Sequence, residues 1–339
     1  MTDVSNASRT LLFDIRSLEW SADLLDLFGI PAEIMPEVRA SSGHFGFTAP
    51  GGPVPEGIPI SGVAGDQQAA LFGQACFSEG MTKNTYGTGS FVLMNVGDTC
   101  PDPVEGLLTT VAWSLDQGKR SGLDPNSSGP IVTAYALEGA IFVTGAAIQW
   151  LRDGLGVISE ASEIGPLAAE CDTTDGVYLV PAFAGLGSPF WDPYARGTLV
   201  GITRGTGRPQ LARATVEAMA YQTRDVVEAM AAASGHNIEE LRIDGGASVM
   251  DLLMQIQADQ LGVPVTRPVN QETTALGAAY LAGLAVGFWD SVEDIQAQWQ
   301  VDRTQAPADD RTGADAAYGQ WARAVERSRD WARELDTPS

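Results

Sequence analysis

The chain has 339 residues, of which 44% are hydrophobic, so it can bury the cores of two domains and is too apolar to be disordered. Its 43 acidic residues outnumber 20 basic ones, and the net charge of −23 excludes nucleic-acid binding and disfavours an anionic membrane surface. Only two basic residues, Lys83 and Lys119, are lysines. We therefore expect a cytoplasmic protein adapted to high salt (halophilic), and an acidic protein from a low-salt organism is the alternative.

The cysteines and the apolar stretches indicate no special compartment. Cys76, Cys100 and Cys171 are widely spaced, and with only two histidines in the chain they predict reduced thiols and no structural zinc site. The first residues are polar and do not resemble a signal peptide. The most apolar stretch, residues 276–286, is too short to span a bilayer, so we expect no membrane insertion.

The first part of the chain predicts helical pieces followed by one short strand and one helix. Residues 1–40 are interpreted as mostly helical, and the Gly- and Pro-rich residues 41–58 as a loop or exposed hairpin. Residues 58–63 predict a short buried strand, and Gly65 opens an Ala-rich helix that ends near residue 76. The character changes near Gly80, which places a domain boundary at about residues 73–82.

Beyond that boundary, strands alternate with helices. We expect a strand, glycine turn and strand over 82–96, a polar surface loop over 116–131, and further strands over 177–181, 241–243 and 263–267. We expect helices over 141–151, 211–234, 252–261, 273–286 and 314–334. This alternation predicts an α/β architecture, and no internal repeat is evident.

A carboxylate stands where α/β proteins place their sites. In Gly62-Val63-Ala64-Gly65-Asp66-Gln67-Gln68, the acid lies after a predicted strand and before a helix, at the carboxyl end of a sheet. Asp66 there can take a hydroxyl proton or hold a metal ion. The alternative, favoured by the local pattern alone, is that Asp66 merely caps the following helix.

Three glycine motifs could approach a ligand. The turn Tyr86-Gly87-Thr88-Gly89-Ser90 could expose N–H groups and a hydroxyl to a phosphate, or it could be a plain hairpin. Asp244-Gly245-Gly246-Ala247 before a helix could contact a nucleotide, or it could be an ordinary βα turn. Leu137-Glu138-Gly139-Ala140, leading to Gly145 and Gln149, predicts a small-faced helix that a backbone or ligand can approach or, more simply, close helix packing.

The order of these motifs resembles one family. Together with Asn6-Ala7-Ser8-Arg9-Thr10, Lys83-Asn84-Thr85-Tyr86-Gly87-Thr88-Gly89 and Trp191-Asp192-Pro193-Tyr194-Ala195-Arg196-Gly197, they are similar to the FGGY carbohydrate kinases, and among these to the glycerol kinases, from about residue 2 to about residue 300. The resemblance implies actin-like ATPase (ribonuclease H-like) domains with the active site in the cleft between them. It also implies ATP with Mg²⁺, and glycerol as the small-molecule substrate.

The resemblance assigns roles to particular residues. Asp66 matches the catalytic base, which also binds glycerol and is a possible metal ligand, and Gln67 and Phe91 match glycerol-binding residues. The residues that match ATP or ADP contacts are Thr88, Gly145, Gln149, Gly246 and Met250. At Met250 the family usually carries Asn, so that contact differs. Positioning, phosphate donors and a base are what phosphoryl transfer requires.

The resemblance also implies an incomplete enzyme. The family's Asp-x-Gly-Thr phosphate loop and part of its glycerol site would precede Met1, so activity of this chain alone is doubtful. We expect residues 1–75 to be the end of the family's N-terminal domain, 76–290 its complete C-terminal domain, and 291–339 a polar, helical tail. The incomplete domain also predicts self-association, which includes a homo-oligomer. The alternatives are a non-catalytic fragment, half of a split kinase that needs the missing N-terminal half, or another FGGY sugar kinase such as a xylulokinase or gluconokinase.

Overall fold

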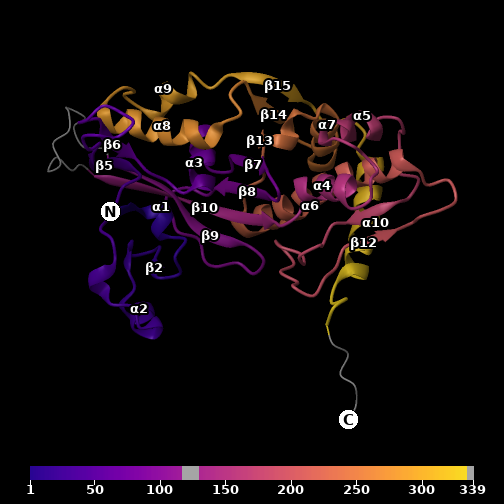
Figure 1. Ribbon diagram of the computed structural model, residues 1–339, viewed down its shortest axis with the longest axis horizontal. Helices are drawn as coiled ribbons and strands as arrows, with labels where there is room; N and C mark the ends of the chain where they lie inside the picture. The colour runs from indigo at the N-terminus through magenta and orange to yellow at the C-terminus, as the bar shows by residue number, and fades with distance from the viewer. Residues whose placement is uncertain (117–129, 334–339) are drawn as a thin grey trace, which may run out of the picture.

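A mixed nine-stranded sheet forms the centre of the computed structural model, which describes residues 1–116 and 130–333 (Figure 1). The strands lie in the order β15-β14-β13-β7-β8-β10-β9-β5-β6, so the α/β architecture is confirmed. Their bounds are β5 (Ser42–Phe47), β6 (Pro59–Gly62), β7 (Thr82–Tyr86), β8 (Ser90–Asn95), β9 (Leu108–Asp116), β10 (Ile131–Ile141), β13 (Leu241–Gly245), β14 (Val265–Pro268) and β15 (Val301–Gln305).

Besides the large sheet, the described residues form three short strand pairs and ten α-helices. The pairs are β1 (Thr2–Asp3) with β4 (Val38–Arg39), β2 (Phe13–Asp14) with β3 (Glu19–Trp20), and β11 (Tyr178–Val180) with β12 (Thr198–Val200). The helices are α1 (Val4–Ala7), α2 (Ala22–Phe28), α3 (Asp66–Gly73), α4 (Gly145–Asp153), α5 (Ile164–Ala168), α6 (Arg208–Ser234), α7 (Asp251–Leu261), α8 (Thr273–Val286), α9 (Val292–Gln296) and α10 (Thr312–Ser328). Short 3₁₀ turns occupy Ala32–Ile34, Ala161–Glu163 and Gly246–Val249. No helix within the described ranges combines the length and apolarity needed to cross a bilayer.

Helices cover both faces of the sheet because its central strands alternate apolar side chains between two cores. On β8, Leu93 packs into the core formed with α3 and α8, whereas Val92 and Met94 pack into the core formed with α4, α6 and α7. Successive strand residues point to opposite faces, so a strand buried on both faces is apolar almost throughout. The hairpin β7–β8 therefore lies in the middle of the sheet, and its turn, residues 87–89, lies where β7 ends and β8 begins.

Two glycines bring α3 against α8. A Cβ atom at Gly73 would overlap the carbonyl of Thr273, and one at Gly277 would overlap the carbonyl of Ala69. Only glycine allows two helix backbones to approach this closely. The N-terminal part of the chain is thus packed directly on a helix that comes some two hundred residues later.

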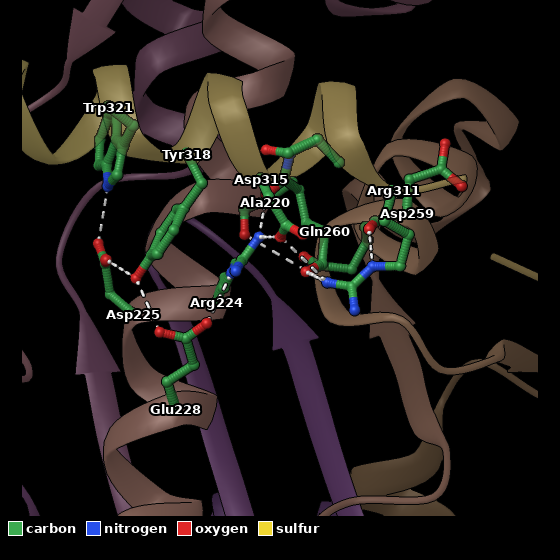
Figure 2. A network of polar contacts seen from close by, with 12 residues as sticks. Ala220, Arg224, Asp225, Glu228, Asp259, Gln260, Arg311, Asp315, Tyr318 and Trp321 are labelled. Carbon is green, nitrogen blue, oxygen red and sulfur yellow. Dashed lines mark hydrogen bonds and ion pairs between the residues drawn. The ribbon is translucent and has the colours of Figure 1, made fainter. Parts of the chain in front are cut away.

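The last helix is held to α6 by a polar network at the end of the sheet opposite the N-terminal segment (Figures 1 and 2). Asp225 accepts hydrogen bonds from the Tyr318 hydroxyl at 2.6 Å and the Trp321 indole N–H at 2.9 Å. Beside them, Arg224 forms an ion pair with Asp315 at 2.9 Å. Burial raises the pKa of Asp225 to about 7, although both hydrogen bonds act in the opposite direction.

The structure differs from the sequence-based expectations at several elements. Residues 1–40 are not mostly helical, since four two-residue strands interrupt them. The strand near residue 60 is not buried but forms the edge of the sheet, where Ile60 is 44% exposed. The helix expected from residue 141 begins only at Gly145, because Ile141 still belongs to β10. Almost all of the expected loop over 116–131 lies outside the described residues.

Candidate active site

The first feature of the site is the exposed carboxylate of Asp66. It is the first residue of α3, and the N-cap position is taken by Gly65, so Asp66 is not the cap that the local pattern favoured. Its Oδ1 accepts the backbone N–H of Gln67 at 2.8 Å. The backbone N–H of Gly65, just before Asp66, donates to the Ser5 hydroxyl at 2.9 Å and so ties the start of α3 to α1. The carboxylate is therefore free on its solvent side and anchored by the backbone behind it.

A buried ammonium brings the three residues matched to glycerol binding together. Lys83 Nζ donates to Gln67 Oε1 at 2.5 Å and to the Phe91 carbonyl at 3.2 Å. The Gln67 amide then donates through Nε2 to Asp66 Oδ2 at 3.3 Å. Phe91 is 36% exposed and pairs with Thr85 across the β7–β8 hairpin, so its ring faces the same side of the sheet as Lys83. An exposed acid, an amide and an aromatic residue are thus linked through one ammonium.

Lys83, Arg9 and Glu138 are site residues that sequence reasoning did not single out. Glu138 on β10 is buried and pairs with the half-exposed Arg9 at 2.7 Å, while its Oε2 has no partner among the described residues. Lys83 could have been noticed, because it is one of only two lysines and lies in a stretch that predicts a buried strand. Arg9 and Glu138 both lie in motifs quoted above, but their pairing gives no signal in the sequence, because only the fold brings together residues 129 positions apart.

The five residues matched to nucleotide contacts all line one cavity of about 780 Å³. These are Thr88, Gly145, Gln149, Gly246 and Met250, and they come from the β7–β8 turn, from α4 and from the segment between β13 and α7. The rest of the wall is largely apolar and includes Ile148, Ile164 and Leu252. A cavity of this size, mainly apolar with a few polar groups, is typical of sites for drug-sized ligands and cofactors.

The glycine turn at the mouth of this cavity is fixed by the start of α4. The N–H groups of Thr144 and Ala146 both donate to the Thr88 carbonyl at 3.0 Å, and that of Gly145 donates to the Gly87 carbonyl at 3.1 Å. The amides at the N-terminus of α4 therefore hold the turn and are not themselves free to bind an anion. Within the described residues, these bonds leave the N–H groups of Thr88 and Gly89 unused, as a phosphate-binding turn requires.

In the motif Asp244-Gly245-Gly246-Ala247, the first glycine is required for its backbone conformation and because a side chain would not fit. Gly245 has a φ of 84°, and a side chain on it would overlap the backbone of Tyr86 on the neighbouring strand β7. At Gly246, in contrast, a Cβ would meet nothing within 4 Å. The chain thus turns tightly at Gly245 and leaves open space at Gly246, on the wall of the cavity.

A metal ion has few protein ligands here. In the part of the chain that the structure describes, no group of three or more His, Cys, Asp or Glu side chains is placed to hold one. Asp66 is a single exposed carboxylate, and the side-chain oxygen of Gln67 is occupied by Lys83. This donor set suits an ion such as Mg²⁺, which is usually bound by one or two carboxylates together with substrate phosphates.

Comparison with known proteins assigns the chain to one family. The model of the FGGY family of carbohydrate kinases, C-terminal domain, matches residues 82–286, and that of the family's N-terminal domain matches residues 1–73. The chain belongs to the FGGY family of carbohydrate kinases. It is 55% identical over 334 residues to the glycerol kinase of Carboxydothermus hydrogenoformans, and 55% identical over 332 residues to that of Chromobacterium violaceum. In each case 98% of this chain is covered.

Solved structures of FGGY kinases share the fold. The glycerol kinase of Plasmodium falciparum with ADP superposes with a TM-score of 0.86 at 36% identity, covering 96% of this chain and 63% of that one. The xylulose kinase of Lactobacillus acidophilus superposes with a TM-score of 0.79 over 96% of this chain and 64% of that one, but at 20% identity this shows only the fold. The predicted actin-like ATPase fold is confirmed, with parts of both family domains present.

The extent of the chain is a separate matter from its family. It spans 64% of the length of the Carboxydothermus protein and 63% of the Chromobacterium protein. Both family domains are matched, so the comparisons do not establish the expected absence of an N-terminal half. The division into residues 1–75, 76–290 and 291–339 stays a prediction.

Proposed function

We propose that this FGGY kinase is a glycerol kinase, which transfers the γ-phosphoryl group of ATP to glycerol and yields sn-glycerol 3-phosphate and ADP. The main support is that one cavity collects Thr88, Gly145, Gln149, Gly246 and Met250, the five residues matched to nucleotide contacts. The short turn after β7 connects this cavity to the strand that carries Lys83, beside Asp66. The names of the relatives at 53–55% identity point to the same substrate.

In this proposal Asp66 is the catalytic base. Its carboxylate is exposed and anchored from behind, so it can accept the proton of a glycerol hydroxyl as the hydroxyl oxygen attacks the γ-phosphorus. Gln67 and the Phe91 ring bind the polyol through an amide and an apolar surface. Phosphoryl transfer depends mainly on positioning and on donors around the phosphates, which Thr88 and the turn amides supply.

Mg²⁺ would neutralise charge on the ATP phosphates when it is bound. Asp66 is the carboxylate of this chain that could contact it, and the phosphates would supply the other ligands. The large acidic excess does not provide a metal cage, because its carboxylates do not converge in the described residues.

The remaining expectations belong to the same proposal. A cytoplasmic location, adaptation to high salt and a possible homo-oligomer are consistent with the charge of −23 and with the exposed Leu27 and Phe28 on α2. A non-catalytic fragment, half of a split kinase, and another FGGY sugar kinase stay as alternatives, since the chain spans 64% of its relatives' length.

The deciding experiment separates nucleotide binding from turnover. The purified chain in high KCl is titrated with ADP by calorimetry and then assayed for ADP release from ATP with glycerol, xylulose or gluconate. We expect ADP binding and glycerol-dependent release. Asp66→Asn should keep ADP affinity and lower turnover by about 10²- to 10⁴-fold, while Asp98→Asn, an exposed control, should change neither.

Other outcomes identify the alternatives. ADP binding without turnover would favour a fragment or a half of a split kinase, and release with xylulose or gluconate would favour another sugar kinase. Absence of ADP binding by the folded chain would contradict the proposal itself.

A further inference from the structure

Lys83 is a buried cation in the middle of the sheet. It lies on β7 between β8 and β13, in register with Leu93 and Arg242, and its side chain is fully buried. On β7, Asn84 and Tyr86 face α6 and α7, where they bond to Thr223 and Gln257. Strand alternation turns Lys83 to the opposite face, where α3 begins with Asp66.

The ammonium has no spare donor. It makes three hydrogen bonds, to Gln67 Oε1 at 2.5 Å, to Thr85 Oγ1 at 2.9 Å and to the Phe91 carbonyl at 3.2 Å. A lysine ammonium carries three N–H donors, so every one is used and its position is set in three directions. Two of the three acceptors belong to Gln67 and Phe91, the residues proposed to bind the substrate.

The contact with Gln67 determines which end of its amide faces Asp66. Because the ammonium can only donate, it binds the amide oxygen and turns the NH₂ group toward Asp66 Oδ2, 3.3 Å away. If the amide were reversed, its oxygen would face the carboxylate and its NH₂ would face the ammonium, and both contacts would be repulsive. One cation thus sets the orientation of the amide that hydrogen-bonds to Oδ2 of the proposed base.

We propose that Lys83 is a positioning residue of the phosphoryl-transfer site, which orients the Gln67 amide and the Phe91 backbone for substrate while not contacting substrate itself. This inference rests on the proposed function for the identity of the substrate. The orientation of Gln67 by Lys83 does not depend on that identity and can be measured without ligand.

The electrostatics show that burying this cation is costly. Burial lowers the pKa of Lys83 to about 8, although the carboxylates of Asp244 on β13, Glu138 on β10 and Asp66 on α3 favour its charged form. Cys76, which follows α3, also acts on it, and the charged Arg242 lies in register with it on β13. Replacing a buried set of paired charges as a whole by apolar residues is often neutral for stability, so the burial of such charges is weak evidence for a purely stabilising role. An apolar side chain at this position could not form the three directed hydrogen bonds of Lys83.

A first measurement uses the chain without ligand. Side-chain amide NMR signals of Gln67 are identified by their loss in Gln67→Ala and followed as the pH is raised through about 8. Loss of a proton from Lys83 removes one of its three donors, so we expect the Gln67 signals to shift with that titration. Gln255 is the internal control, since its amide bonds to Asp259 and to the Ala306 carbonyl. A Gln67 amide that does not respond would overturn the proposal, and this measurement needs no variant of Lys83 to fold.

A second measurement uses a double-mutant cycle on glycerol affinity. If Lys83 acts through Gln67, Lys83→Met should weaken glycerol binding by about ten- to a hundred-fold, and by much less when Gln67 is already Ala. A purely structural lysine would instead lower the melting temperature and leave affinity unchanged, or would act equally in both backgrounds. Either result would overturn the proposal. If the unaltered chain binds ADP but no glycerol, the proposed substrate is wrong, and the amide titration still decides the role of Lys83.

Discussion

The Tyr318 hydroxyl donates a 2.6 Å hydrogen bond to Asp225, joining α10 to α6 across 93 residues of sequence (Figure 2). With the indole of the fully buried Trp321 on the other carboxylate oxygen, this contact holds the last helix to the sheet. The carboxylate is itself buried, so its ionisation is coupled to the stability of the whole chain.

Asp225 should make stability depend on pH. Its pKa is raised from 3.8 to about 7 by burial, so the stability it contributes is fully present below about pH 3.8 and is lost as the pH rises through about 7. Between these two pKa values, each pH unit lowers the free energy of unfolding by about 1.4 kcal/mol. Between about pH 5 and pH 8, unfolding free energy should therefore fall by about 2 to 3 kcal/mol more in the unaltered chain than in Asp225→Asn.

Urea unfolding at several pH values measures this difference. Asp309→Asn, at an exposed position, is the control and should keep the pH dependence of the unaltered chain. Parallel curves for Asp225→Asn and the unaltered chain would show that Asp225 does not titrate in this range.

Gly277→Ala should destabilise the protein strongly. Alanine normally stabilises a helix by up to about 1 kcal/mol relative to glycine, but here the new methyl group would overlap the Ala69 carbonyl on α3. We expect a loss of about 2 to 4 kcal/mol, in the upper range for overpacked cores. Gly319→Ala, within α10 and with nothing within 4 Å, is the matched control and should be neutral or stabilising. Equal melting temperatures for the two variants would mean that α3 and α8 are not in backbone contact.

Gly246→Leu should block the cavity without disturbing the fold. The new side chain would extend into open space on the cavity wall, so we expect the melting temperature to change little and the Kd for ADP to rise at least about tenfold. Gly319→Leu has the same open surroundings, lies outside the cavity, and should leave ADP affinity unchanged. Unaltered affinity in Gly246→Leu would place the nucleotide elsewhere.

Salt should raise the melting temperature. The net charge is −23, so the excess acidic side chains repel one another in the compact state. Salt near 1 M shortens the range of this repulsion to about 3 Å. We expect a rise in KCl that is steepest at low concentration. Sucrose at matched osmolality is the control for effects unrelated to charge. A melting temperature that falls with KCl would argue against adaptation to high salt.

Much of the fold could be predicted from local pattern. The hairpin β7–β8, the helix that starts at Asp66 and the long helix α6 were expected within a few residues, because glycine turns and helical periodicity mark them. The strands β9 and β10 were not expected. The helix expected around Gly139 is wrong, because this residue lies in strand β10, but it is closely packed: a side chain there would overlap Val226 on α6.

The candidate site also has one part that the sequence predicts and another that it does not. The residues that line the cavity lie in motifs whose glycines and order along the chain are visible in the sequence. The polar pairs behind Asp66 are not, since Lys83 contacts Gln67 across the face of the sheet and Arg9 reaches Glu138 from the turn that follows α1. Such pairs depend on register and helix packing, which no local pattern specifies.

The backbone contact between Gly73 and Gly277 also limits how such a gene can be recombined. A chimaera that takes residues 1–75 from one relative and the rest from another places a breakpoint between α3 and α8, whose backbones touch. If either parent carries a side chain at one of these two positions and compensates by shifting a helix, the hybrid inherits the side chain without the shift. Viable exchanges should therefore transfer α3 and α8 together, although they lie far apart in the coding sequence.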